Sequence, residues 1–266
     1  MDLRVLIIDP QNDFCNKNGA LFVPGADDDM VRLSAMINRL KDKISDIHVT
    51  LDTHHFVDIA HPTFWVDSDG NHPESLKTVI TVDDVENGKW RATNPQLQKR
   101  ALEYVRSLET NKRYALVIWP YHCLIGSWGY GVYPELYDAL LKWEKDFCMV
   151  DYVTKGSNIY TEHYSAVQAD VPDPQDPSTM LNTRLIQTLE EADIIALSGE
   201  ALNFCLANTV TDIANNFGEE NIKKFVLLTD ATSVVPGKDF EPLTENFLKE
   251  MTQRGMQVST TKEFLN

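Results

Sequence analysis

The chain has 266 residues, with 24 Lys and Arg against 40 Asp and Glu, and therefore a formal net charge of −16. Because 43% of the residues are hydrophobic, the chain can bury a substantial core, which argues against global disorder. A surface this acidic repels phosphate backbones and anionic lipids, so nucleic acid and membrane surfaces are poor candidate partners.

Short apolar runs alternate along the chain with segments of helical periodicity. The predicted strands are Arg4–Ile8, Ile47–Leu51, Ala115–Ile118, Phe147–Val150, Ile194–Leu197, Phe225–Leu228 and Gln257–Ser259. The predicted helices are Asp29–Lys43, Leu136–Lys145, Thr183–Glu191, Phe204–Asn216 and Leu243–Arg254. Runs rich in Val, Ile and Leu are typical of strands buried on both faces. The pattern predicts an α/β fold with a doubly wound, mainly parallel sheet and helices on both of its faces.

Residues 66–111 interrupt this alternation. Within them, Lys77–Val82 and Lys89–Ala92 are predicted to pair as a small hairpin, and Gln96–Leu108 is predicted to be an added helix. We interpret the segment as an insertion beside the functional site, within a single domain that spans residues 1–266.

The N-terminal sequence MDLRVLIIDP has too short an apolar run for a signal peptide, and no run approaches the roughly 20 residues that span a bilayer. The four cysteines are widely spaced and form no CxxC pair. This usage predicts reduced thiols and a cytoplasmic protein.

Polar side chains follow the first five predicted strands. Asp9 follows the first, Asp52 the second and His122 the third, while Lys155 and Cys205 come after the fourth and fifth. Ligands of open parallel sheets bind at the carboxyl ends of the strands. We therefore expect these five side chains to gather at one edge of the sheet.

Cys205 is the candidate nucleophile. An arbitrary cysteine is more often a buried apolar residue, and an isolated Asp9 or Lys155 is more often a surface charge. Here Gly199 permits a tight strand-to-helix turn, and both a helix start and a nearby cation lower the pKa of a thiol. Lys155 is expected to pair with Asp9 and to stabilise the thiolate, and Asp9 is expected to act as a general base.

Asp52, His54 and His122 form the candidate metal site. Alternate residues of an extended segment point the same way, so Asp52 and His54 can face one point that His122 completes. The alternative for Asp52 and His54 is a strand-end turn with a solvated histidine. Two imidazoles and a carboxylate suit zinc, with iron or manganese as alternatives, and His61 is a possible additional ligand.

Aromatic residues lie beside these polar groups in the sequence. Phe14, Phe64, Trp65 and Trp119 are either ordinary core residues or the walls of a slot for a flat ring such as a pyridine. We select Phe14, Phe64 and Trp119 as candidate substrate-binding residues.

Five ordered motifs resemble the nicotinamidase and pyrazinamidase branch of the isochorismatase-like cysteine hydrolases. They are Asp9-Pro10-Gln11-Asn12-Asp13-Phe14, Asp52-Thr53-His54 with His61 to Phe64, Trp119-Pro120-Tyr121-His122-Cys123, Lys155-Gly156, and Gly199-Glu200-Ala201 through Cys205. The resemblance covers most of the chain outside the insertion. It implies a six-stranded, isochorismatase-like sheet with a Rossmann-like strand order.

The resemblance also implies the chemistry of the site. It implies a catalytic triad of Asp9, Lys155 and Cys205, and a metal ion on the three candidate ligands. It further implies a cis peptide between Glu200 and Ala201, which directs the N–H groups of Ala201 and Cys205 at an oxyanion. The implied reaction is conversion of nicotinamide to nicotinate and ammonia through a thioester on Cys205.

Two alternatives remain open at this point. The chain could be an isochorismatase-like hydrolase of another small substrate, since the insertion enters where the substrate pocket is walled, or a non-catalytic binding module. The expected partners are a small-molecule amide and further copies of the same chain.

Overall fold

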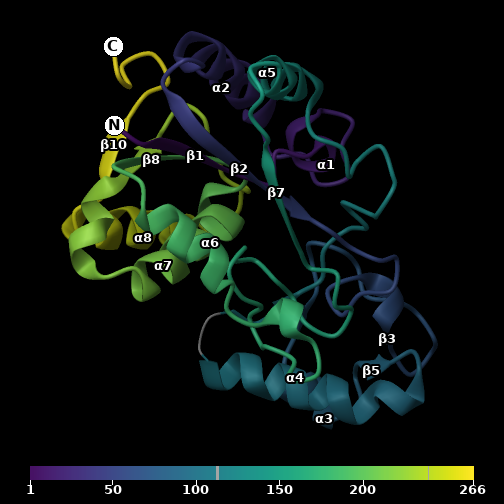
Figure 1. Ribbon diagram of the computed structural model, residues 1–266. Coiled ribbons are helices and arrows are strands. Elements are labelled where there is room, and N and C mark those ends of the chain that lie inside the picture. Colours follow the sequence, from purple (N-terminus) through teal and green to yellow (C-terminus); the bar gives the residue numbers. More distant parts are fainter. Residues whose placement is uncertain (112–113, 239) are drawn as a thin grey trace.

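A six-stranded parallel sheet forms the centre of the molecule (Figure 1). The computed structural model describes residues 1–111, 114–238 and 240–266. The strand order is β10-β9-β8-β1-β2-β7, and each neighbouring pair is parallel. The strands are β1 (Leu3–Ile8), β2 (Ile44–Asp52), β7 (Asp151–Lys155), β8 (Ile194–Gly199), β9 (Phe225–Leu228) and β10 (Gln257–Ser259). The predicted parallel α/β fold is confirmed.

Helices cover both faces of this sheet. Side chains of α2 (Ala26–Leu40) and α5 (Pro134–Glu144) share one buried cluster with Val5 and Ile7 of β1. The other cluster contains Leu6 and Ile8 of β1 together with side chains of α6 (Thr183–Glu190), α7 (Ala207–Asn216) and α8 (Glu241–Gln253). Because successive residues of a strand point to opposite faces, β1 contributes to both cores, as the apolar run predicts.

Two predicted strands of the central sheet are wrong. Phe147–Val150 is not a strand, because Phe147 is fully exposed with a φ of 61° and the Val150 N–H donates to Glu144, which ends α5. The strand is β7, which begins at Asp151 and ends at Lys155. The predicted strand Ala115–Ile118 is reduced to β6 (Leu116–Val117), which pairs outside the central sheet.

The predicted hairpin within the insertion is also wrong. β4 (Val79–Ile80) pairs antiparallel with β6, and β5 (Arg91–Ala92) pairs antiparallel with β3 (Trp65–Val66). Between them lies α3 (Val82–Glu86), which starts at a capping box formed by Thr81 and Asp84. The side-chain oxygen of Thr81 accepts from the Asp84 N–H, which favours a helix where the hairpin was expected.

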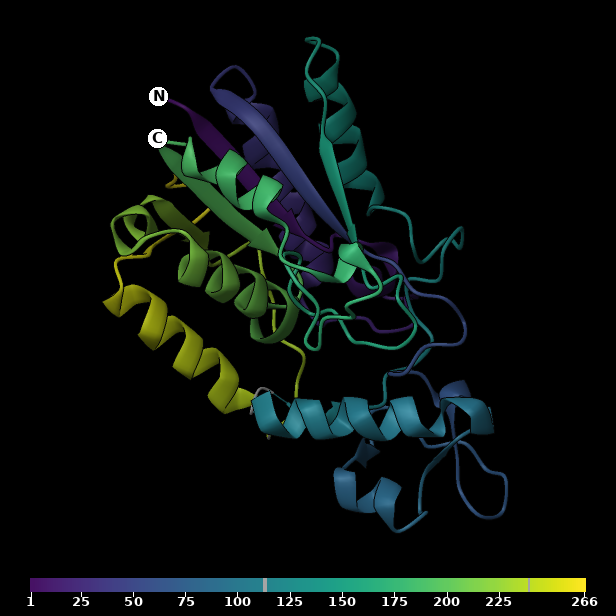
Figure 2. The same ribbon diagram turned by 60° about the horizontal axis from the view of Figure 1, so that its bottom comes forward.

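The added helix of the insertion is present as α4 (Gln98–Asn111). It lies beyond the carboxyl ends of the central strands, together with α3, β3 and β5 (Figures 1 and 2). Its buried face joins the same core cluster as α6 and α7, which supports the single-domain interpretation. The buried residues of α4 are Ala101, Tyr104, Val105 and Leu108.

Short helical turns complete the described chain. They are α1 (Asn12–Cys15), the 3₁₀ turns Pro62–Phe64, Pro95–Leu97, Pro177–Thr179 and Glu219–Lys224, and the π-helical turn Leu202–Leu206. Within the residues that the structure describes, every helix is too short or too polar to cross a bilayer.

Candidate active site

The carboxyl ends of β1, β2, β7 and β8 meet at one point of the sheet edge. Asp52, the last residue of β2, pairs in register with Lys155, the last residue of β7. Asp9 follows β1 directly, and Ile8 pairs with Gly199 at the end of β8. A Cβ atom at Gly199 would lie 2.0 Å from the Ile8 carbonyl oxygen, so only glycine permits this close approach of the two backbones.

His122 lies at the same point, but the element that carries it differs from the predicted one. It lies in the loop after β6, so four ends of central strands, and not five, carry the candidate residues. A β-bridge between His54 and Leu124 holds this loop beside the continuation of β2. The His54 N–H donates to the Cys123 carbonyl, and the Ile125 N–H donates to the His54 carbonyl.

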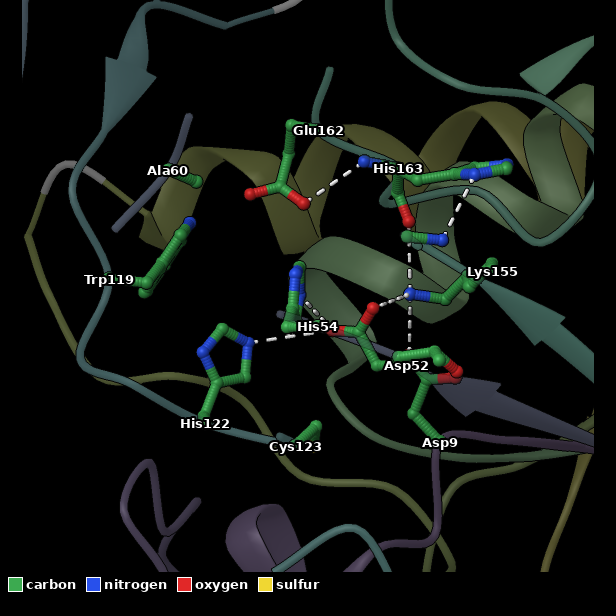
Figure 3. A network of polar contacts seen from close by, with 12 residues as sticks. Asp9, Asp52, His54, Ala60, Trp119, His122, Cys123, Lys155, Glu162 and His163 are labelled. Atoms are coloured by element: carbon green, nitrogen blue, oxygen red, sulfur yellow. Dashed lines mark hydrogen bonds and ion pairs between the residues drawn. The ribbon is translucent and has the colours of Figure 1, made fainter. Parts of the chain in front are cut away.

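Lys155 is the centre of the polar network (Figure 3). Its Nζ lies 2.9 Å from Asp9 Oδ2, 3.1 Å from Asp52 Oδ1 and 3.6 Å from Cys205 Sγ. It also donates to the His163 carbonyl oxygen at 2.9 Å. The structure therefore brings Asp9, Lys155 and Cys205 together, as the sequence predicts, and adds Asp52 to the group.

The charges of this network stabilise one another. Burial opposes the charge of Lys155, but Asp52 and Asp9 outweigh it and hold the pKa of the ammonium well above its usual value. Burial likewise opposes ionisation of Asp52, yet His54 and Lys155 keep the pKa of this carboxyl well below its usual range. One cation is thus shared by two buried carboxyl groups, which is the arrangement that a buried charge requires.

The pKa of the Cys205 thiol differs from the sequence-based expectation. Burial raises its pKa well above the usual value, and the opposing effect of Lys155 is not sufficient to reverse this. Burial of Cys205 therefore favours the neutral thiol over a preformed thiolate. Burial also raises the pKa of Asp9, which makes this carboxylate a stronger base for the thiol proton.

Cys205 lies within the π-helical turn Leu202–Leu206, just before α7. The helix predicted from Phe204 therefore begins as a π turn and becomes α-helical at Ala207. The peptide bond between Glu200 and Ala201 is cis, as the sequence resemblance implies.

Asp52, His54 and His122 converge on one point. His54 Nε2 lies 3.1 Å and His122 Nε2 lies 3.4 Å from Asp52 Oδ2. Two ligand atoms at about 2.1 Å from one ion in tetrahedral geometry are about 3.4 Å apart, so these separations fit ligands of a single metal ion. All three side chains are at least 95% buried.

The acceptors beside the Nδ1 atoms of the two imidazoles leave both Nε2 atoms free to bind a metal ion. His54 Nδ1 lies 3.1 Å from Asp58 Oδ2, and His122 Nδ1 lies 2.8 Å from the Pro120 carbonyl oxygen. An Nδ1–H that donates to such acceptors leaves the Nε2 lone pair for a metal ion. Both Nε2 atoms face Asp52, so the donor set fits a divalent cation.

His61 is a further candidate ligand. Its ring lies with those of His54 and His122 in a group whose possible ligand atoms are all within 4.8 Å of one another. Burial, and then the two neighbouring histidines, lower the pKa of His61 to about 3, so its imidazole is neutral and can bind a metal ion. His55 and His72, in contrast, are exposed.

A small pocket of roughly 30 Å³ lies beside Cys205. Phe14 and Trp119 line it, as predicted, whereas Phe64 packs against Trp65 in the core and is not among the described lining residues. The remaining lining residues are Leu21, Val23, Asp52, His122, Glu162, Tyr164, Ala201, Phe204, Cys205 and Val235.

Glu162 is the functional candidate that sequence reasoning missed. Its side chain points into the site between Trp119 and His163 (Figure 3). Oε1 accepts from the His163 N–H at 3.0 Å, and Oε2 has no hydrogen-bond partner among the described residues. Burial raises the pKa of Glu162 to about 8. No apolar periodicity surrounds Glu162, so the sequence held no signal for its position.

The fold resembles solved structures of nicotinamidases and pyrazinamidases. An Acinetobacter baumanii nicotinamidase/pyrazinamidase is 21% identical, with 98% of this chain and 97% of that chain covered at a TM-score of 0.64. The yeast nicotinamidase bound to the inhibitor nicotinaldehyde is 17% identical, with coverages of 97% and 99% and a TM-score of 0.66. The Pyrococcus horikoshii pyrazinamidase in complex with zinc is 18% identical, with coverages of 98% and 99% and a TM-score of 0.58.

No family model and no curated protein sequence matches the chain. The likeness therefore concerns the fold, over nearly the whole length of each chain. By its fold, this chain is similar to solved nicotinamidases and pyrazinamidases, the group that its sequence motifs resemble.

Proposed function

We propose that the protein is a metal-dependent cysteine amidohydrolase that converts nicotinamide to nicotinate and ammonia. The observation that carries this proposal is the position of Lys155, which contacts Asp9, Asp52 and Cys205 at the same time. A nucleophile, a base and a cation between them are the groups that thiol-based amide hydrolysis requires. The likeness in fold to known amidases supports this assignment.

In the proposed mechanism, Asp9 removes the proton of Cys205 as Sγ attacks the amide carbon. The carbonyl oxygen becomes an oxyanion, which the N–H groups of Ala201 and Cys205 stabilise. Asp9 then returns the proton to the departing nitrogen, the C–N bond breaks and ammonia leaves. Lys155 keeps its charge throughout and balances the negative charge that passes between Cys205 and Asp9.

The second half of the reaction regenerates the thiol. Asp9 removes a proton from a water molecule, whose oxygen attacks the thioester carbon. The C–S bond breaks, and the proton on Asp9 returns to Cys205. The net reaction consumes one amide and one water and yields one carboxylic acid and one ammonia.

Asp52, His54 and His122 would hold the divalent metal ion. Zinc suits a carboxylate with two imidazoles, and iron and manganese suit the same ligands. When bound, the ion supplies a positive charge that can orient a ring nitrogen and can lower the pKa of water. In the metal-free protein, the carboxylates of Asp52 and Asp58 outweigh burial and raise the pKa of His54, so a proton takes the place of the ion.

The pocket favours a flat aromatic amide. Phe14, Trp119 and Phe204 present rings to the space beside Cys205. A pyridine ring gains area burial and edge-to-face contacts between such walls. Relatives with this fold are recorded with nicotinaldehyde and with nicotinate, which are ligands of this shape.

A panel of amides tests the proposal. We expect ammonia release from nicotinamide, and about one equivalent of metal per site measured on the same sample. Metal-replete protein that releases no ammonia from nicotinamide but hydrolyses another amide would support the alternative of a different isochorismatase-like substrate. Inactivity on every amide, with the metal bound, would favour a non-catalytic binding module.

The buried carboxyl of Glu162 makes stability depend on pH. Its pKa is about 8 in the folded protein and near 4.5 when unfolded, so between these values the folded state binds the additional proton. The contribution of Glu162 to stability is therefore present at low pH and is lost as the pH rises towards 8. We expect Glu162→Gln to remove this loss, so that the variant gains stability relative to wild type as the pH rises.

Urea denaturation of metal-free protein at a series of pH values measures this difference. Glu103→Gln on the exposed face of α4 is the control, and it should leave the pH dependence unchanged. A constant difference between Glu162→Gln and wild type across the series would contradict the prediction.

The expected homo-oligomer remains a prediction, and β7 is where we place its interface. β7 is an open edge of the sheet, and the preceding residues Phe147 and Met149 are 101% and 82% exposed. We expect light scattering to give a mass above that of one chain, and Phe147→Asp with Met149→Asp to reduce it to one chain. Val258→Asp at the opposite edge is the control, and a monomeric wild type would refute the prediction.

A further inference from the structure

Glu200 is a buried carboxyl group that the mechanism above does not use. It lies between the end of β8 and the turn that carries Cys205, and its side chain is fully buried. It is not among the pocket-lining residues, and its contacts are made with the segment 231–235 and with α2.

Two carboxyl groups meet at Ser233. Glu200 Oε2 accepts from the Ser233 N–H at 3.1 Å, and the Ser233 hydroxyl donates to Asp29 Oδ2 at 2.5 Å. Asp29 is 2% exposed, so both carboxyl groups are out of solvent. Among the described residues, no donor binds Glu200 Oε1.

The surroundings of this pair disfavour a charge on Glu200. Arg32 Nη2 binds Asp29 Oδ1 at 2.6 Å and neutralises that carboxylate. Cys15 of α1 also lies close enough to Glu200 to interact with it, and it supplies no positive charge. Burial, together with the Asp29 carboxylate, raises the pKa of Glu200 well above its usual value, so Glu200 retains its proton.

The segment that Glu200 contacts holds the whole turn before Cys205. The Gly199 N–H donates to the Ala231 carbonyl at 2.9 Å, and the Thr232 hydroxyl donates to the Gly199 carbonyl at 2.6 Å. The Leu202 N–H donates to the Ser233 carbonyl at 2.8 Å.

Farther along the same segment, Val235 continues this pairing with the turn. The amide of Asn203 exchanges two hydrogen bonds, each of 3.0 Å, with the backbone of Val235. Val235 also lines the pocket. The segment 231–235 therefore connects the position of Glu200 both to the turn of Cys205 and to the wall of the pocket.

We propose that Glu200 is a positioning residue for Cys205: its buried carboxyl group holds the backbone N–H of Ser233, whose hydroxyl is bound to Asp29, and so fixes the turn that carries the thiol. The consequence for catalysis rests on the proposed function. The reactivity of the thiol, however, can be measured without any amide substrate.

Alkylation of Cys205 by iodoacetamide tests this inference. The modified Cys205 peptide is quantified by mass spectrometry, which separates it from the other cysteines, and melting is recorded for each variant. The variants are Glu200→Gln, which is neutral and similar in shape, Glu200→Leu, which cannot bind Ser233, and Ser233→Ala. Glu220→Gln, on an exposed turn, is the matched control.

We expect Glu200→Gln and Glu220→Gln to be alkylated within about twofold of the wild-type rate. Glu200→Leu should change the alkylation rate by about tenfold or more, and kcat should fall more than KM changes, since small displacements of a nucleophile act on the chemical step. Ser233→Ala should lie between these, because it keeps the backbone N–H that Glu200 binds.

Four outcomes bear on the inference. A folded Glu200→Leu variant with wild-type alkylation overturns it, and so does a Glu200→Gln variant as impaired as Glu200→Leu. If Glu200→Leu does not fold, a Glu200→Gln variant whose alkylation rate changes by about tenfold or more overturns the inference, and so does a Ser233→Ala variant with the wild-type rate. If no amide is hydrolysed but the alkylation pattern holds, the proposed function fails and the positioning role stands.

Discussion

Replacing Cys205 with Ala is expected to abolish amide hydrolysis, with a loss of about 10⁴-fold or more in kcat. The proposed thioester cannot form without Sγ. Among the described residues, the other contacts of Lys155 are made by Asp9, Asp52 and the His163 carbonyl, and none of these supplies a second thiol. The change removes one buried sulfur atom, so the melting temperature should shift little. Ammonia release at saturating substrate measures the effect.

Cys148→Ser is the control for this substitution. Cys148 is partly exposed and lies before β7, away from the pocket, so its replacement should leave kcat within about twofold of wild type. Retention of wild-type activity by Cys205→Ala would refute the proposed mechanism for any substrate that the protein hydrolyses.

Replacing Lys155 with Met is expected to destabilise the protein by about 3–5 kcal/mol. Methionine has a similar length but no charge, so Asp9 and Asp52 would remain buried without their shared cation. The loss should shrink as the pH falls into the usual carboxyl range, because protonated Asp9 and Asp52 carry no charge to compensate. Urea denaturation of metal-free protein at several pH values measures both effects.

The matched control for Lys155 is Lys249→Met on the exposed side of α8, which should change stability by no more than about 0.5 kcal/mol. The activity of Lys155→Met should also be low, since Cys205 and Asp9 lose the charge between them. A folded Lys155→Met protein with wild-type stability across the pH series would show that the network is not coupled as described.

The central sheet was predictable because its strands are buried on both faces. A strand such as β1 must be apolar at every position, and its continuous run distinguishes it from an amphipathic helix. The same property located the site, because Asp9 and Asp52 stand where an apolar run stops. Lys155 lies at the predicted sheet edge even though its strand was predicted four residues too early.

The errors in the insertion have a common physical cause, which is pairing between segments that are distant in the chain. Lys77–Val82 and Lys89–Ala92 have the composition of a hairpin, but their actual partners are Leu116–Val117 and Trp65–Val66. Such pairings depend on tertiary structure, which local patterns do not record. Glu162 was missed for the same reason, since only the folded loop brings it to the pocket.

The protonation state of Cys205 could not be predicted from its neighbours in sequence. A helix start and a lysine both lower the pKa of a thiol, and both were correctly inferred. Burial has the opposite effect, and its magnitude depends on how completely the surrounding loops cover the sulfur atom. That quantity is a property of the folded chain.

The small volume of the pocket has a kinetic consequence. A space of roughly 30 Å³ accommodates about one water molecule, whereas a pyridine carboxamide is several times larger. We therefore expect side chains that line the pocket to move before a substrate of this size can approach Cys205. Association is then a gated process, in which the rate of binding saturates at high substrate concentration at the frequency with which the walls open.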